Sequence, residues 1–173
     1  MRRIMMAICA LCLTLNCVKA QDWSANGEEY LQNSLTFEYQ AIDNAFGFGA
    51  TVVFNHLNIN FSLIDGDTNA YIEENSAWRI GAGYNHRFWL NSFLYLEGAV
   101  GAQYTHSKIE YDGGKESEGN IGMFVTPKIG IKLFHWDEID WGIQAGYRWD
   151  FHKFKFTKEY TADYFTIGIL GLF

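Results

Sequence analysis

The sequence predicts an all-β fold, an eight-stranded antiparallel up-and-down transmembrane β-barrel, on three observations. Apolar and polar side chains alternate at period two in segment after segment from Ser34 onward, which is typical of strands with two unlike faces. The last segment, residues 163–173, has the length of about ten residues that one tilted membrane-spanning strand needs, about half of a spanning helix. Beyond residue 20 there is no run of about eighteen apolar residues, so membrane contact would have to come through a barrel.

The alternation defines eight segments that are separated by polar or glycine-containing stretches. They are residues 34–41, 46–54, 57–63, 78–85, 94–104, 121–133, 139–150 and 163–173. The connections at 55–56, 86–92 and 134–138 are short, and the alternating connections at 65–76, 106–119 and 152–162 are longer. The connection at 42–45 is the exception, because it is short but belongs to the side of the longer loops. An even number of strands, with short turns on one side and longer loops on the other, is the arrangement of bacterial outer-membrane barrels. Both chain ends would then lie on the short-turn side.

The first 20 residues have the features of a signal peptide. Arg2 and Arg3 precede an apolar run over residues 4–15, and Val18-Lys19-Ala20 supplies small residues before a cleavage site ahead of Gln21. A lipoprotein site at Cys17 is the weaker alternative, because the preceding residues match one poorly.

Residues 21–33 show no periodicity and are interpreted as a periplasmic lead-in, either an irregular tail or a one-turn interfacial helix. The barrel itself would occupy residues 34–173.

Cysteine and charge exclude several functions. All three cysteines, Cys9, Cys12 and Cys17, lie in the expected leader, so the mature chain would have no disulfide, thiol nucleophile or thiolate metal site. The formal net charge is −7, and loss of the three positive charges of the leader would make it −10. Such acidity argues against nucleic acid as a partner, because phosphate binding needs clustered Lys and Arg.

The polar strand faces are small and carry few charges, which favours a narrow interior over a face in open water. A soluble lipocalin-type barrel with its apolar face inward is the alternative that period two alone leaves open. The charges balance, four acidic against four basic, as pairing in a confined lumen requires, and Glu97 is expected to pair with Arg79 or Lys128. The predicted lumen network is Glu38, Arg79, Glu97, Lys128, Lys132, Asp140, Arg148 and Asp150.

Aromatic residues gather at the strand ends, where an amphipathic ring suits a membrane interface. The predicted aromatic girdle consists of Phe54, Trp89, Phe93, Trp136, Trp141 and Phe173 at the short-turn end and Trp149 at the other end.

A strand that finishes the chain on Phe173 resembles the closing strand of Gram-negative outer-membrane barrels, in which that ending acts as an assembly signal. Residues 34–173 resemble the small eight-stranded family of outer membrane protein X and the transmembrane domain of outer membrane protein A. The aromatic-rich, acidic chain with a leader ending in Ala20-Gln21 also looks like the porin-family barrels of Bacteroidetes. The resemblance implies integral outer-membrane localisation, contact with outer-membrane lipid and lipopolysaccharide, and recognition of the C-terminal strand by the outer-membrane assembly machinery.

Three functions compete on the sequence. The first is a structural or surface-interaction barrel with a plugged lumen and acidic loops at 65–75 and 108–118; the second is a small non-specific pore. The third, less favoured, is a lipid A-modifying enzyme, for which such barrels use His and Ser two apart on one strand face.

The residues that chemistry would need are poorly placed in this sequence. His106 and Ser107 are adjacent and so point to opposite faces. Asp150 and His152 share a face, but the sequence places no serine beside them. The five histidines are scattered, and Asp65-Gly66-Asp67-Thr68-Asn69 lacks the later glutamate of a calcium loop. We therefore expect no catalytic residue, metal or cofactor.

Overall fold

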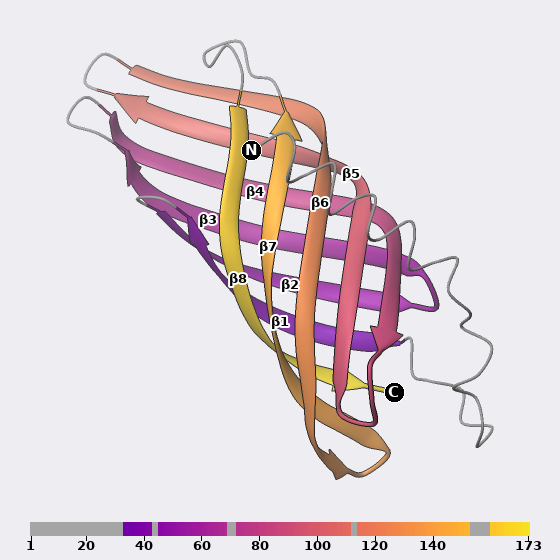
Figure 1. Cartoon of the computed structure of the whole chain (residues 1–173). Helices are drawn as coiled ribbons and strands as arrows, with labels where there is room; N and C mark the ends of the chain where they lie inside the picture. The colour runs from indigo at the N-terminus through magenta and orange to yellow at the C-terminus, as the bar shows by residue number, and fades with distance from the viewer. Residues whose placement is uncertain (1–32, 43–44, 69–71, 112–113, 153–159) are drawn as a thin grey trace, which may run out of the picture. The chain divides into compact units, whose positions relative to one another are not determined.

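The structure is a computed structural model that describes residues 33–42, 45–68, 72–111, 114–152 and 160–173 (Figure 1). The predicted signal peptide and residues 21–32 of the predicted lead-in lie outside the described residues. Within the described part of the chain, no helix is long and apolar enough to cross a membrane.

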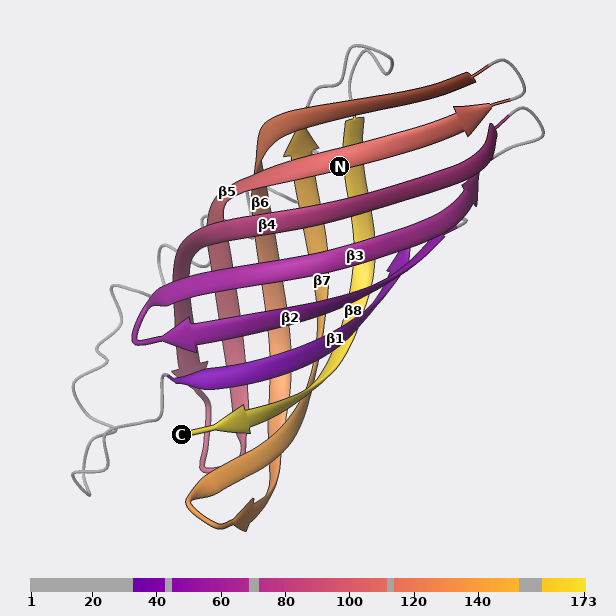
Figure 2. The same ribbon diagram turned by 180° about the vertical axis from the view of Figure 1, so that it is seen from behind.

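Eight antiparallel strands form one closed barrel in chain order, as the alternation predicts. Their bounds are β1 (Ser34–Ile42), β2 (Ala45–Phe54), β3 (Leu57–Thr68), β4 (Ile72–Trp89), β5 (Leu94–Tyr111), β6 (Gly114–Trp136), β7 (Ile139–His152) and β8 (Tyr160–Leu172). The first and last strands close the sheet, from Ser34 opposite Leu172 to Ala41 opposite Phe165. Figure 1 and Figure 2 show the indigo β1 and the yellow β8 meeting at this seam.

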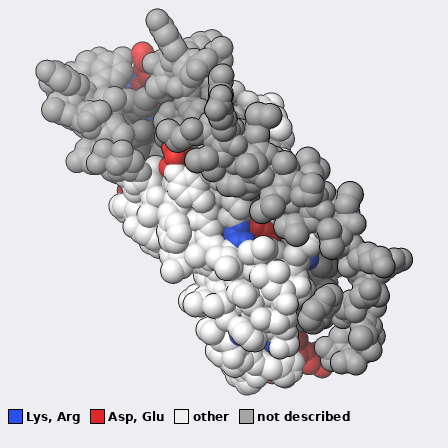
Figure 3. All heavy atoms as spheres, viewed as in Figure 1, with Lys and Arg blue, Asp and Glu red and all other residues white. Residues whose placement is uncertain are grey.

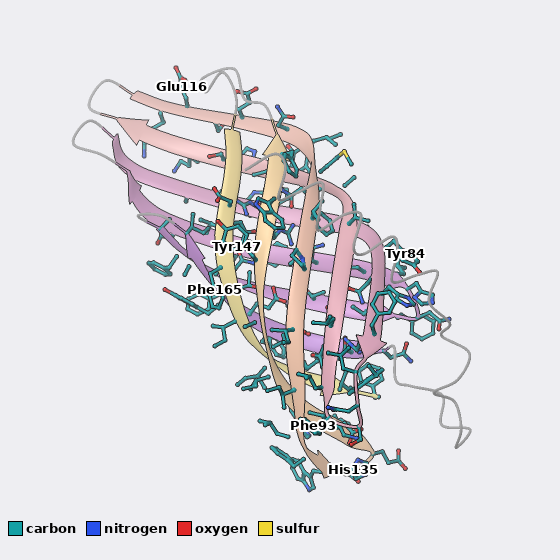
Figure 4. The ribbon with its side chains drawn as sticks, viewed as in Figure 1. Tyr84, Phe93, Glu116, His135, Tyr147 and Phe165 are labelled. Atoms are coloured by element: carbon teal, nitrogen blue, oxygen red, sulfur yellow. The ribbon has the colours of Figure 1, made fainter. Side chains whose placement is uncertain are left out.

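The barrel has two ends that the connections distinguish. We call the end with the β2–β3, β4–β5 and β6–β7 connections the turn end and the opposite end the loop end. The turns are tight: Asn55, Asp137 and Glu138 have positive φ angles of 58°, 48° and 66°, which Asn and Asp tolerate best among residues other than glycine. Phe93 and His135 lie at the turn end in Figure 4, and Glu116 lies at the loop end.

Side chains follow the predicted alternation between the two faces of the wall. Along β1, for example, Ser34, Thr36, Glu38 and Gln40 are buried inside, whereas Leu35, Phe37 and Tyr39 are exposed outside. The same division continues around the barrel, and most of the described surface visible in Figure 3 is uncharged. The soluble alternative, with its apolar face inward, does not fit this arrangement because the apolar face is the outer one.

Several strands extend further than the alternation predicts. The expected loops at 65–76 and 106–119 are largely strand, because β3 continues to Thr68, β4 begins at Ile72, and β5 and β6 continue to Tyr111 and from Gly114. Backbone pairing holds these extensions together, from Tyr104 opposite Ile121 to Tyr111 opposite Gly114. Both faces of the extensions carry polar residues, so no apolar alternation marks them in the sequence.

The β6–β7 ladder is interrupted at Thr126 and Pro127, between the pairs Val125–Trp149 and Lys128–Gly146. Proline has no backbone N–H and therefore cannot donate a ladder hydrogen bond. The register on both sides of the interruption is the same, so the wall continues past it without a slip.

Glycines inside the barrel make room for aromatic rings. A Cβ atom at Gly130 would lie 2.0 Å from Tyr95 Cζ, whereas a Cβ atom at Gly98 on the outer face would meet nothing within 4 Å. Gly130 and Tyr95 are opposite one another in the β5–β6 register. The buried Tyr95 ring thus occupies the space above the Gly130 backbone.

We expect Gly130→Ala to destabilise the barrel by about 1–3 kcal/mol, because the new methyl group would force the Tyr95 ring out of its position. Gly98→Ala is the matched control and should leave stability nearly unchanged. The measurement is the urea midpoint, followed by the gel shift between folded and boiled protein. Equal midpoints for the two variants would contradict the assigned Tyr95 packing.

Candidate functional site: the charged lumen

Six of the eight predicted lumen residues are buried inside the barrel. Their exposed fractions are 7% or less, and they are Glu38, Arg79, Glu97, Lys128, Arg148 and Asp150. The other two, Lys132 and Asp140, are half-buried near the turn end. All eight share the inward parity of their strands, and the six buried ones need partners because water is excluded from them.

The charges nearer the turn end form one connected group. Arg87 donates to Glu97 Oε2 from Nε at 3.0 Å and from Nη2 at 2.5 Å. Lys128 Nζ binds the Glu38 carboxylate and lies 3.9 Å from Glu97 Oε1. Gln144 Nε2 also donates to Glu38 Oε1, at 3.0 Å. Two carboxylates and two cations thus neutralise one another within a single cluster, which we call the lower cluster.

A second group, the upper cluster, surrounds Asp150 nearer the loop end. Arg79 Nη1 lies 2.5 Å from Asp150 Oδ2, and Arg148 Nε lies 2.8 Å from Oδ1. The Tyr164 hydroxyl donates to Asp150 Oδ2 at 3.1 Å and accepts from Arg79 Nη1 at 2.7 Å. Arg148 Nη2 also donates to the side-chain oxygen of Gln103. A carboxylate with no exposed surface therefore bridges two guanidinium groups.

Each buried arginine also lies against an aromatic ring. The guanidinium carbon of Arg148 is 4.3 Å from the Phe124 ring centroid, and the carbon of Arg87 is 4.8 Å from the Tyr95 centroid. Arg79 lies 5.3 Å from the Tyr164 centroid. Such contacts stabilise a cation by about 0.5–2 kcal/mol, more when water is excluded. The aromatic rings fill lumen space that the ion pairs leave.

Asp140 anchors a third, more exposed group at the turn end. Lys132 Nζ lies 3.1 Å from Asp140 Oδ2, and His135 Nδ1 lies 2.9 Å from Oδ1. Because Lys132 keeps a third of its side-chain surface in water, this pair contributes little to stability.

The predicted pairing of Glu97 needs a correction. Its close partner is Arg87, Lys128 is at the edge of ion-pair distance, and Arg79 instead pairs with Asp150. Arg87 was expected in a turn, but β4 continues to Trp89 and turns Arg87 inward. When Arg87 is added, the lumen network has five cationic residues and four acidic ones. The predicted balance of four against four was therefore incomplete, because it omitted Arg87. The alternation Arg79, Gly81, Gly83, Asn85, Arg87 was the available signal.

The lumen also contains apolar and aromatic side chains that the sequence does not mark. Tyr95, Leu170 and Leu172 form a buried cluster, and Trp89 packs against it. Trp89 was predicted in the girdle, which was wrong: it follows Arg87 on the inward parity of β4, and its ring lies 5.0 Å from that of Tyr95. This group, close to the turn end, is the hydrophobic plug.

The remaining girdle residues lie outside the lumen to different extents. Trp136, Phe54, Phe93 and Phe173 are exposed, with Trp136 the most exposed at 68%. Trp141 and Trp149 are half-buried, and the Trp149 ring lies 5.0 Å from that of Tyr147. Figure 4 shows Tyr147 and Phe165 near the middle of the barrel and Phe93 at its turn end.

The residues considered for catalysis are not assembled into a catalytic arrangement. His106 is half-buried and packs on Trp78, whereas Ser107 is buried on the opposite parity. The Asp150 carboxylate already accepts from Arg79, Arg148 and Tyr164. Across the described ranges, no group of three or more His, Cys, Asp or Glu side chains is arranged to hold a metal ion.

Comparison with known proteins places the fold. Neisserial surface protein A is similar in structure, with a TM-score of 0.58 and 12% identity over 82% of this chain and 94% of that chain. The N-terminal β-barrel domain of OprF from Pseudomonas aeruginosa has a TM-score of 0.51 and 10% identity over 82% of this chain and 98% of that chain. No protein-family model matches the chain, and no curated protein matches its sequence. The chain thus has the fold of the small eight-stranded outer-membrane barrels.

We expect Glu97→Ala to lower the unfolding free energy by about 3–5 kcal/mol, because the buried Arg87 would lose the carboxylate that accepts two of its hydrogen bonds. Replacing both members, as Arg87→Met with Glu97→Met, should restore much of that loss. The unfolding temperature, read from the gel shift, measures both effects. A single variant as stable as the wild type would show that Glu97 is not paired in the interior.

Proposed function

We propose that the protein is an integral outer-membrane β-barrel with a plugged lumen and a structural or surface-interaction role. The observation that supports this most strongly is the filled interior: the lower cluster, the upper cluster and the hydrophobic plug occupy the barrel along its length. The outer wall supports the membrane location, because it exposes large apolar side chains from every strand. In this proposal, residues 1–20 are the signal peptide of a Gram-negative envelope protein and are removed before Gln21.

The proposed partners follow from the two surfaces of the barrel. Outer-membrane lipid and lipopolysaccharide would cover the apolar wall, and the assembly machinery would recognise the C-terminal strand that ends in Phe173. The extended β5–β6 hairpin carries Glu116 and Glu118 on β6 and would present them to a surface partner. Glu116 lies at the loop end in Figure 4. The short turns would face the periplasm.

A small non-specific pore is the second candidate, because some buried polar atoms lack partners. Asn85 has both side-chain atoms buried without a hydrogen bond in the described part of the chain, and so do Thr105 Oγ1 and Thr126 Oγ1. Such groups are usually satisfied by internal water. Water at these positions would not by itself join the two ends of the lumen, because the hydrophobic plug lies close to the turn end.

A lipid A-modifying enzyme is the least supported candidate. The carboxylate that would orient an imidazole, that of Asp150, is engaged by two arginines and a tyrosine, and Ser107 faces away from His106. We therefore propose no catalytic residue and no cofactor.

In a planar lipid bilayer, we expect the wild-type barrel to pass almost no current, because its lumen is filled by paired side chains. Truncating part of the plug and part of the lower cluster together, as Trp89→Ala with Arg87→Ala and Glu97→Ala, should raise the frequency of open events. Steady wild-type conductance would contradict the plugged lumen and favour the pore.

Location is tested separately from conductance. In a Gram-negative host, we expect the chain to fractionate with the outer membrane and to show a gel shift between unboiled and boiled samples. Deleting Phe173 should slow assembly without changing synthesis, if the C-terminal strand is the recognised element. Recovery of the chain in the soluble fraction without detergent would contradict the proposed location.

A further inference from the structure

The fold brings together two histidines that are thirty residues apart in the sequence. His56 lies in the β2–β3 turn and His86 lies on β4, and their ring centroids are 5.2 Å apart with an interplanar angle of 21°. Asn85 N donates to His56 O at 2.8 Å, so a backbone hydrogen bond fixes the turn against β4 beside the pair. The backbone positions of both histidines are thus fixed by the pairing of the turn with β4.

The tautomer of His56 suits metal binding. Its Nδ1 lies 3.1 Å from the carbonyl oxygen of Asn85, and a carbonyl only accepts, so Nδ1 carries the proton and Nε2 keeps a lone pair in the neutral ring. Metal-binding histidines usually donate their second nitrogen to a backbone carbonyl or carboxylate in this way. The His56 imidazole therefore has its outer-shell hydrogen bond in place.

His86 can adopt the same tautomer. Its Nδ1 lies 3.4 Å from the Tyr84 hydroxyl, which can accept the Nδ1 proton and leave the His86 Nε2 lone pair free. The ring is half-buried and makes an edge contact with Phe88 at 4.2 Å. Tyr84 stacks on His56 at 5.2 Å and lies outside the barrel wall in Figure 4. The aromatic neighbours limit the rotation of both imidazoles.

The ring separation is compatible with two ligands of one metal ion that lies in the planes of both rings. A ring nitrogen lies about 2.0–2.1 Å from a bound Zn²⁺, and half the ring depth adds roughly 1 Å, so two rings on a tetrahedral ion have centroids about 5 Å apart. In the described part of the chain, no third His, Cys, Asp or Glu completes a set. Solvent would fill the remaining positions.

We propose that His56 and His86 form a two-histidine site for a divalent first-row transition-metal ion at the turn end of the outer wall. Imidazole ligands favour Cu²⁺ and Zn²⁺ over Mg²⁺ or Ca²⁺, which prefer oxygen. The inference is independent of the proposed function, because the pair lies on the outer face and uses none of the lumen residues. The structure brings two of the five histidines together, although they are scattered along the sequence.

The test is Cu²⁺ binding to the folded chain, purified without a histidine tag in a non-chelating detergent. Calorimetry should show one Cu²⁺ site, and electron paramagnetic resonance should show coupling to two imidazole nitrogens. His56→Ala and His86→Ala should each weaken binding by about tenfold or more and remove one nitrogen from the spectrum. His106→Ala and His135→Ala are the controls and should bind as the wild type does. Mg²⁺ should not bind.

A folding defect is separated from loss of a ligand by the gel shift and by second variants, His56→Asn and His86→Gln, which keep polar side chains of similar length. Loss of one nitrogen signal in folded variants supports the site. Wild-type affinity in both pair variants, equal loss in His106→Ala or His135→Ala, or no Cu²⁺ binding to the wild type would each overturn it.

Discussion

A closed sheet of eight strands gives every side chain only two destinations, the narrow lumen or the outer face. Alternate residues of β1 meet this constraint in the simplest way, with Glu38 inside and Phe37 outside. Because the lumen of an eight-stranded barrel is just wide enough for side chains, whatever points inward must pack and pair there. The rest of the structure follows from this division, and a slip of one residue in any strand would reverse it.

Because space in the lumen is limited and water is largely excluded, charged side chains that point inward have to pair with one another. Moving an ion out of water costs several kcal/mol, and a partner offsets that cost only when the contact is direct. The two clusters meet the condition: Asp150 is shared by Arg79 and Arg148, and Glu97 is held by Arg87. Buried pairs of this kind stabilise a fold little compared with apolar packing. A different strand register would separate the partners and leave buried charges unpaired, which costs several kcal/mol. We infer that they specify the register more than they strengthen the barrel.

The sequence predicts the fold well because the period-two alternation repeats in every strand and the last segment has the length of one membrane-spanning strand. It predicts strand ends and individual partners less well. Arg87 follows the inward parity of β4, but it was assigned to a turn because it lies close to the end of the strand. Trp89 was assigned to the girdle from its residue type, although its parity also points inward. The β5–β6 extension is polar on both faces and so has no alternation to detect. The proximity of His56 and His86 depends on the β3–β4 register, in which Leu57 lies opposite Tyr84, and no local pattern encodes that register.

The division between the two faces is tested most directly by neighbouring residues of the closing strand. In a chain that starts at Gln21, which contains no cysteine, a single cysteine at position 167 should carry a fluorophore that brominated lipid acyl chains quench strongly. A cysteine at position 166, whose native threonine has 1% of its surface exposed, should resist labelling in the folded barrel. Quenching at 167 with protection at 166 is the result that the account predicts. Labelling at 166 with no lipid quenching at 167 would contradict it.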